Sequence, residues 1–248
     1  MFRRAHALAA MAAAAITAVT LASPASAAPP VPPAPAITPG AGLAIYDASS
    51  AFGASCTLGF LATGSDGSRY AFTAGHCDKG GNALMPYQTP GNYQRIGRFT
   101  ASEDGNGWDP DIATIRLDSN LPIDTRVLAR RPVAGLTSTV GSDDTLCFYG
   151  MRSGLRCGQV QWSTESAAID SRVSFSATAV GGDSGAPVYR IGSDGTATAV
   201  GVLDSTDDAS GVVSATLIEP YLQKWGLTLD VTPRVPSPAQ PVGYQPSR

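Results

Sequence analysis

The chain has 248 residues, enough for one large β domain or two smaller units. It is rich in glycine (27) and proline (19), which indicates many turns and few long helices. Beyond its first 27 residues, which hold two Arg and no acidic residue, it has 15 basic against 20 acidic residues. The chain is therefore mildly acidic, and it has no cluster of Lys and Arg that could bind phosphates, so we exclude a DNA- or RNA-binding role.

The N-terminus has the pattern of a secretory signal peptide. A short positive segment, Met1–His6, precedes an apolar stretch, Ala7–Leu21, and Ala25-Ser26-Ala27 fits the small-x-small cleavage rule. The apolar stretch is shorter than the ~20 residues that a membrane-spanning helix needs. We expect residues 1–27 to be removed, and the mature protein to be secreted to the extracellular space without a membrane span.

Proline-rich segments follow the leader and end the chain. Residues 28–40 alternate proline with small residues and predict a semi-rigid linker, and residues 232–248 predict a disordered tail. Neither segment has an apolar pattern to bury, and we expect no chemistry from either.

Short apolar runs separated by turn signals predict an all-β fold between these segments. Gly64–Gly67 and Ser193–Gly195 have the composition of hairpin turns. Only Ile218–Trp225 has helical character, with Gly226 placed to end the helix. Alternating helices, which a Rossmann domain or a TIM barrel needs, are absent. The predicted strands are 42–46, 56–62, 69–73, 94–99, 111–117, 145–149, 157–162, 172–177, 187–190, 197–204 and 212–217.

The four cysteines are even in number and enter an oxidising compartment, so two disulfides are expected. Four cysteines allow three connectivities, of which the local pairing of Cys56 with Cys77 and of Cys147 with Cys157 is the simplest. A zinc site is the competing interpretation. It is disfavoured because the chain has no C-x-x-C motif and His76 is its only histidine after the leader. We expect no metal and no cofactor.

Three segments carry residue types suited to nucleophilic chemistry. Thr73–Cys77 contains His76, Asp111 starts an apolar strand, and Gly181–Val188 places Ser184 inside a glycine-rich turn. Acyl transfer by serine needs a hydroxyl, an imidazole to take its proton and a carboxylate to orient the imidazole. Each segment alone also fits a plain structural role, but together they supply all three groups.

The order His76, Asp111, Ser184 is that of the chymotrypsin family. With Thr-Ala-Gly-His-Cys at 73–77 and Gly-Asp-Ser-Gly at 182–185, residues 42–231 resemble secreted bacterial chymotrypsin-like serine proteases of the streptogrisin and α-lytic, actinobacterial branch. The resemblance implies two antiparallel β-barrels, here residues 41–125 and 126–231, with a short C-terminal helix. It also implies the disulfides Cys56–Cys77 and Cys147–Cys157.

The same resemblance implies roles for the site residues, in a peptidase that acts on polypeptide substrates. Ser184 is the nucleophile, His76 the general base and Asp111 the residue that orients the imidazole, while the backbone N–H groups of Gly182 and Ser184 form the oxyanion hole. Asp109 competes with Asp111, but Asp-Ile-Ala at 111–113 matches the family pattern.

Three alternatives compete with this interpretation. A lipase of the α/β-hydrolase class needs a histidine after the serine, and none follows Ser184. A calcium loop starting at Asp104 would have Trp108 at its fifth position and no Glu at its twelfth, which favours a surface turn. A catalytically weak or inactive binding protein on the same scaffold remains the second hypothesis.

The sequence departs from the family in three ways. Ala186 replaces the second glycine after the serine, and no cysteine pair braces the specificity pocket. No activation cleavage site precedes the first strand, so we expect activity as soon as the chain is folded and oxidised. The buried Asp183 then needs an internal cation, for which Arg152 and Arg156 are the candidates.

Two residues bear on specificity. Thr178, six residues before the nucleophile, is expected at the base of the pocket, where its hydroxyl favours neutral side chains. Asp204 stands where relatives have a serine that touches the triad carboxylate. It either faces Asp111, faces the pocket and rescues some basic specificity, or becomes a surface charge through a one-residue slip.

Overall fold

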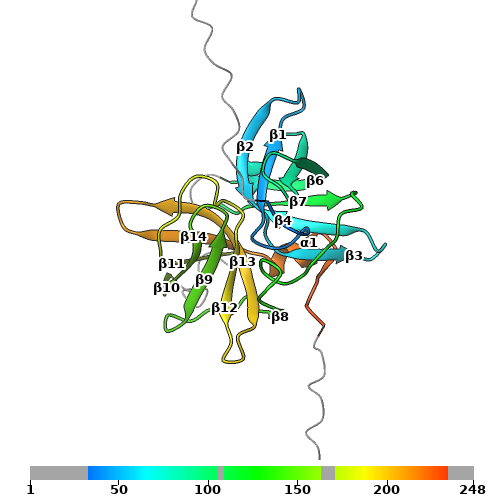
Figure 1. Cartoon of the computed structure of the whole chain (residues 1–248). Coiled ribbons are helices and arrows are strands. Elements are labelled where there is room, and N and C mark those ends of the chain that lie inside the picture. The colour runs from blue at the N-terminus through cyan, green and yellow to red at the C-terminus, as the bar shows by residue number, and fades with distance from the viewer. Residues whose placement is uncertain (1–32, 106–108, 163–170, 234–248) are drawn as a thin grey trace, which may run out of the picture.

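The computed structural model describes residues 33–105, 109–162 and 171–233. They form two β-sheets, each curled around its own core, with one short α-helix near the C-terminal end of this range (Figure 1). The predicted all-β, two-barrel fold class is confirmed. The predicted signal peptide, residues 106–108 of the candidate calcium loop and the tail from residue 234 lie outside the described residues.

The first sheet has eight strands in the spatial order β15-β3-β4-β7-β6-β5-β1-β2, and every neighbouring pair is antiparallel. In chain order the strands are β1 (Gly42–Tyr46), β2 (Phe52–Thr57), β3 (Leu61–Gly64), β4 (Arg69–Thr73), β5 (Asn82–Pro86), β6 (Tyr93–Asp104), β7 (Asp111–Leu117) and β15 (Leu227–Leu229).

The second sheet has seven strands in the order β12-β9-β10-β11-β14-β13-β8. A further pairing of β12 with β13 closes six of them into a barrel, and β8 joins outside it, parallel to β13. The strands are β8 (Val133–Leu136), β9 (Thr145–Gly150), β10 (Gly154–Trp162), β11 (Arg172–Ser176), β12 (Pro187–Ile191), β13 (Ala197–Asp207) and β14 (Val212–Leu217).

Most predicted strands are present, and β1, β4, β7 and β14 have the predicted ends. The predicted strand 56–62 is wrong as one element, because the chain leaves β2 at Thr57 and re-enters the sheet in β3 at Leu61. The sequence missed β5, β8 and β15, which are three to five residues long and too short to show a period. Both predicted hairpin turns form, between β3 and β4 and between β12 and β13.

The buried side chains form three clusters. One fills the first barrel around Leu43 and Ile96, and one fills the second around Phe148 and Phe175. The third draws on both sheets, from Phe72 of β4 to residues of the second barrel and the helix. The barrels therefore share a continuous apolar interface, which fixes how they sit against each other.

The C-terminal part of the described chain returns to the first barrel. Helix α1 (Glu219–Lys224) lies within the predicted range, and β15 then pairs with β3. Glu103 of β6 accepts a hydrogen bond from the Tyr221 hydroxyl at 2.8 Å and forms an ion pair with Lys224. Residues 219–229, which the sequence assigned to the second barrel, are thus held on the first one.

The end of the predicted linker is packed rather than free. Ile37 and Thr38 are fully buried, and the Ile37 backbone hydrogen-bonds with Pro122 and Asp124. The Thr38 hydroxyl donates to the Arg126 carbonyl and accepts the Ala129 N–H at 3.2 Å. Residues 34–40 therefore join the first barrel to the segment that connects the two barrels.

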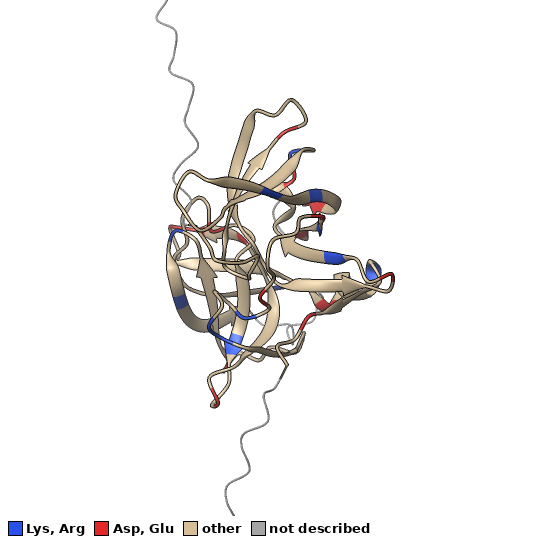
Figure 2. Ribbon diagram, turned by 45° about the vertical axis from the view of Figure 1, so that its right-hand side comes forward, with Lys and Arg blue, Asp and Glu red and all other residues tan. Residues whose placement is uncertain are grey.

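Both disulfides form with the predicted pairing, Cys56 with Cys77 and Cys147 with Cys157. Acidic and basic residues are interspersed over the described ribbon, without a stretch where Lys and Arg gather (Figure 2). Within the same residues, no helix is long and apolar enough to cross a bilayer.

Candidate active site

His76 lies on a short 3₁₀ turn, Gly75–Cys77, that directly follows β4. A side chain at Gly75 would put its Cβ only 1.9 Å from the Glu103 carbonyl oxygen, so the turn needs glycine there. The disulfide from Cys77 to Cys56 ties the turn to the end of β2. The imidazole thus projects from a rigid part of the first barrel.

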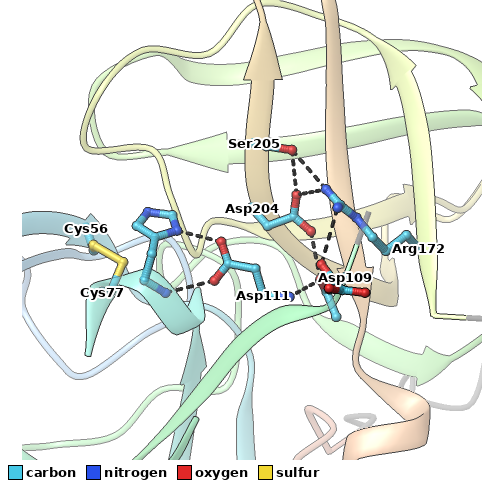
Figure 3. Close-up of polar contacts among 9 residues, drawn as sticks. Cys56, Cys77, Asp109, Asp111, Arg172, Asp204 and Ser205 are labelled. Carbon is cyan, nitrogen blue, oxygen red and sulfur yellow. Dashed lines mark hydrogen bonds and ion pairs between the residues drawn. A yellow bond between two sulfur atoms is a disulfide. The ribbon is translucent and has the colours of Figure 1, made fainter. Parts of the chain in front are cut away.

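Asp111, the first residue of β7, is the carboxylate that meets the imidazole (Figure 3). One carboxylate oxygen lies 2.6 Å from His76 Nδ1, and the other accepts the His76 backbone N–H at 2.8 Å. The competing Asp109 contributes its backbone carbonyl to Arg172 instead. The hydrogen bond to Asp111 raises the pKa of His76 above its usual 6.5, against the opposing effect of burial.

Ser184 comes from the second barrel, in the turn between β11 and β12. It lines one pocket with His76, of about 220 Å³, together with Ala179, Val180, Gly181, Leu203, Asp204, Ser205 and Thr206. Between these described residues, no hydrogen bond joins the Ser184 hydroxyl to the imidazole. Catalytic hydrogen bonds often tighten only when substrate binds, so this geometry is compatible with a nucleophile and its base.

The backbone N–H groups of Gly182 and Ser184 donate to no described residue, whereas those of Asp183 and Gly185 are paired with Val180 and Leu203. Gly182 has φ +106°, a conformation that residues with a Cβ rarely adopt. Two N–H donors next to the candidate nucleophile are therefore left available to an oxyanion.

The fully buried Asp183 carboxylate is satisfied without a cation. It accepts the backbone N–H groups of Arg152, Ser153 and Val180 at 2.9–3.1 Å, and the Ser153 hydroxyl also donates to it. The expected guanidinium partner was wrong for both candidates, because Arg152 supplies its backbone N–H and Arg156 binds the Leu155 carbonyl. Several neutral donors can compensate a buried carboxylate as well as one cation can.

Asp204 is paired with an arginine that the sequence did not identify (Figure 3). Nη2 of Arg172, in β11, lies 2.5 Å from Oδ1 of Asp204, and both side chains are almost fully buried. The Thr216 hydroxyl donates to the other Asp204 oxygen at 2.7 Å and accepts the Asp111 backbone N–H at 3.1 Å. Burial raises the pKa of the Asp204 carboxyl, and the Arg172 guanidinium acts in the opposite direction.

Of the three placements considered for Asp204, the surface charge is wrong, since its side chain is 0% exposed. The residue borders the pocket, but its carboxylate is turned to Arg172 and Thr216, which links it to Asp111 indirectly. Thr178 was expected at the base of the specificity pocket. It is exposed and is not among the residues that line the pocket with His76 and Ser184, so the structure does not place it there.

Among the described residues, potential metal-ligating atoms come together at Cys56, His76 and Cys77. Both sulfurs are bound in a disulfide and cannot act as thiolate ligands, so these residues do not fit a metal.

The chain is 31% identical over 169 residues to an uncharacterized protein of Mycobacterium tuberculosis, strain H37Rv. The match covers 60% of this chain and 67% of the mycobacterial protein. The chain belongs to one family with this mycobacterial protein. No protein-family model matches it.

Solved structures extend the likeness. A Nocardiopsis protease is 24% identical with a TM-score of 0.59, and the match covers 78% of this chain and 98% of the protease. An α-lytic protease homolog, N4, is 25% identical with a TM-score of 0.56, and the match covers 77% of this chain and 97% of the homolog. A glutamic acid-specific serine protease, described as using a histidine triad in substrate binding, has a TM-score of 0.61 at 18% identity, covering 78% of this chain and all of that one. The fold is that of the bacterial chymotrypsin-like serine proteases.

The buried Arg172–Asp204 pair leads to a stability prediction. Arg172→Met leaves a buried carboxylate without its cation and should lower the free energy of unfolding by about 3–5 kcal/mol. Adding Asp204→Asn should recover most of that loss, because the unpaired charge is gone. Urea denaturation of the single and double variants measures both effects.

The exposed pair Arg95–Asp118 is the control, and Arg95→Met should cost about 1 kcal/mol or less. A double variant as unstable as the sum of its single variants would contradict the pairing.

The raised pKa of His76 is directly testable, since no other histidine follows residue 27. NMR titration of the mature protein should give a pKa above 6.5, and Asp111→Asn should lower it because the partner charge is lost. An unchanged pKa in Asp111→Asn would show that the imidazole is not paired with Asp111 in solution.

Proposed function

We propose that the protein is a secreted serine endopeptidase that hydrolyses peptide bonds through an acyl-enzyme. The observation that carries the proposal is that His76, which is paired with Asp111, lines one pocket with Ser184, on the fold of serine proteases. Nucleophile and base come from different barrels, and no structural requirement of a β-barrel would bring these residue types together there.

In this mechanism the Ser184 hydroxyl attacks the scissile carbonyl while His76 Nε2 takes its proton. Asp111 accepts from Nδ1, which leaves Nε2 free as the base, and it stabilises the imidazolium that forms. His76 then gives the proton to the leaving amine, and a water activated by the same imidazole releases the acyl group. The Gly182 and Ser184 N–H groups stabilise the negative charge on the carbonyl oxygen.

The pocket supports a preference for neutral side chains. Its wall combines the apolar Ala179, Val180 and Leu203 with the hydroxyl residues Ser205 and Thr206. Among the described residues that line the pocket, Asp204 alone has a carboxylate, and this group is paired with Arg172, so a substrate cation would be buried without a partner. A histidine triad like that of the glutamic acid-specific protease cannot form, because His76 is the only histidine after residue 27.

Activity without an activating cleavage is part of the proposal. In the animal enzymes a freed N-terminus pairs with the aspartate before the serine. Here the four donors to Asp183 all come from residues 152–180 of the same barrel. The two disulfides and the predicted leader support secretion. The substrates of the secreted enzyme would be extracellular polypeptides.

Active-site labelling tests the enzyme hypothesis. The mature protein should react with a fluorophosphonate–rhodamine probe and hydrolyse fluorescein-labelled casein, whereas Ser184→Ala should lose the labelling and at least ~10³-fold of the hydrolysis. The labelling rate should rise with pH through the raised pKa of His76, since only the neutral imidazole can take the serine proton. A folded mature protein that neither reacts nor hydrolyses casein would favour the inactive binding protein.

A peptide library varied at the residue before the cleaved bond tests the pocket. We expect small or apolar residues to be preferred, with Lys and Arg disfavoured. Asp204→Asn should leave that profile unchanged, because its carboxylate is not exposed. Strong cleavage after Arg or Lys, lost in Asp204→Asn, would show that Asp204 faces the substrate.

A further inference from the structure

Thr57 belongs to the first barrel, yet it holds the nucleophile loop of the second. It ends β2, is fully buried, and donates its backbone N–H to the Ser184 carbonyl at 2.7 Å. Its hydroxyl donates to the Gly182 carbonyl at 2.9 Å and accepts the Met151 N–H at 3.0 Å.

These contacts lie next to the two N–H groups left free in the loop: one on the carbonyl of Gly182 itself, the other on the carbonyl of Ser184. Each peptide unit is planar, so a fixed carbonyl also fixes the plane of the amide that follows it. Thr57 fixes the Gly182 and Ser184 carbonyls, which lie on either side of the Ser184 N–H. The anchored planes are the peptides 182–183 and 184–185, so the peptide that carries the Ser184 N–H lies between two fixed planes. The peptide that carries the Gly182 N–H joins the first of these planes at the Gly182 Cα.

The loop is rich in glycine, and the contacts from within the second barrel hold its centre, through the Asp183 side chain and the Asp183 and Gly185 N–H groups. Gly181, Gly182 and Gly185 each lack a Cβ, and a glycine backbone samples many conformations at little cost. The Thr57 backbone N–H restrains only the Ser184 end. The hydroxyl is the group that reaches the Gly182 end from the first barrel.

Thr57 also connects this loop to the base. Its neighbour Cys56 is bonded to Cys77, which follows His76 in the chain. We propose that Thr57 is a positioning residue for the oxyanion hole, whose hydroxyl holds the Gly182 and Ser184 donors in place relative to His76. This inference rests on the proposed peptidase function.

The test compares labelling kinetics of variants with the same fluorophosphonate–rhodamine probe. Thr57→Val keeps the shape and the backbone contacts but removes the hydroxyl. The maximal labelling rate should fall about 10-fold to 100-fold, less than the ~10²–10³-fold loss from removing an oxyanion donor. The probe concentration for half-maximal rate should change by no more than about twofold, and Thr57→Ser should restore most of the rate.

Thr38→Val is the matched control. The Thr38 hydroxyl is equally buried, donates to one carbonyl and accepts one backbone N–H, but its partners, Arg126 and Ala129, lie in the segment that connects the barrels and not in the loop around Ser184. It should lower the melting temperature much as Thr57→Val does while leaving the labelling rate unchanged. If Thr57→Val does not fold, Thr57→Ala and Thr57→Ser, which differ only by the hydroxyl, give the same comparison.

The outcomes separate the two proposals. If the wild type reacts at Ser184 and Thr57→Val reacts equally fast, the Thr57 inference is wrong and the peptidase proposal stands. An equal loss of rate in Thr38→Val would also overturn it, since the effect would then be one of general stability. A wild type that does not react at Ser184 overturns the peptidase proposal and the inference with it.

Discussion

The candidate site depends on the junction between the barrels, because Ser184 and His76 reach one pocket from opposite sides of it. A shift of about 1 Å between barrels would separate a nucleophile from its base. Two connections oppose such a shift. Thr57 hydrogen-bonds with the Ser184 loop while Cys56–Cys77 ties it to the His76 turn, and the Asp111 N–H binds Thr216 of the second barrel. Thr57 and Thr216 are fully buried, so these polar contacts are in a water-excluded environment, in which hydrogen bonds are stronger.

Segments near both ends of the described chain support the same junction. Residues 34–40 pack between the first barrel and the interbarrel connection, and β15 carries the end of the second domain back onto β3. The sequence could not indicate either contact. A proline-rich segment has the composition of a spacer unless a partner surface is known, and three residues such as Leu227–Leu229 form a strand only because β3 offers an open edge.

Local patterns predicted most of the strands, the hairpin turns and the helix. The family resemblance marked His76, Asp111 and Ser184 as candidates, and the structure pairs His76 with Asp111 and brings His76 into one pocket with Ser184. What the local patterns could not predict is the pairing that depends on tertiary contact. Asp204 stands in an apolar run and needed a cation, but nothing in the sequence distinguishes Arg172 from the other arginines. Asp183 showed the opposite error. Its carboxylate was expected to need a cation, but it is bound by backbone N–H groups. Every residue except proline has such a group, so the sequence does not show which of them will donate to a buried carboxylate.

Three buried carboxylates belong to the region of the candidate site, and each is compensated differently. Asp204 lines the pocket, Asp111 pairs with His76, and Asp183 precedes Ser184 in the chain. Asp183 is held by neutral donors, Asp204 by a guanidinium, and Asp111 by an imidazole whose charge depends on pH. A buried carboxylate whose charge is compensated by hydrogen bonds or by a cation needs neither a proton nor a ligand to be stable. Of the ionisable groups among the described residues that line the pocket, the Asp204 carboxylate is turned to Arg172, and His76 alone remains partly exposed, with its pKa raised by the hydrogen bond to Asp111. The packing therefore leaves one partly exposed ionisable side chain among the described residues of the pocket, His76, which is the group that the peptidase proposal uses as the base.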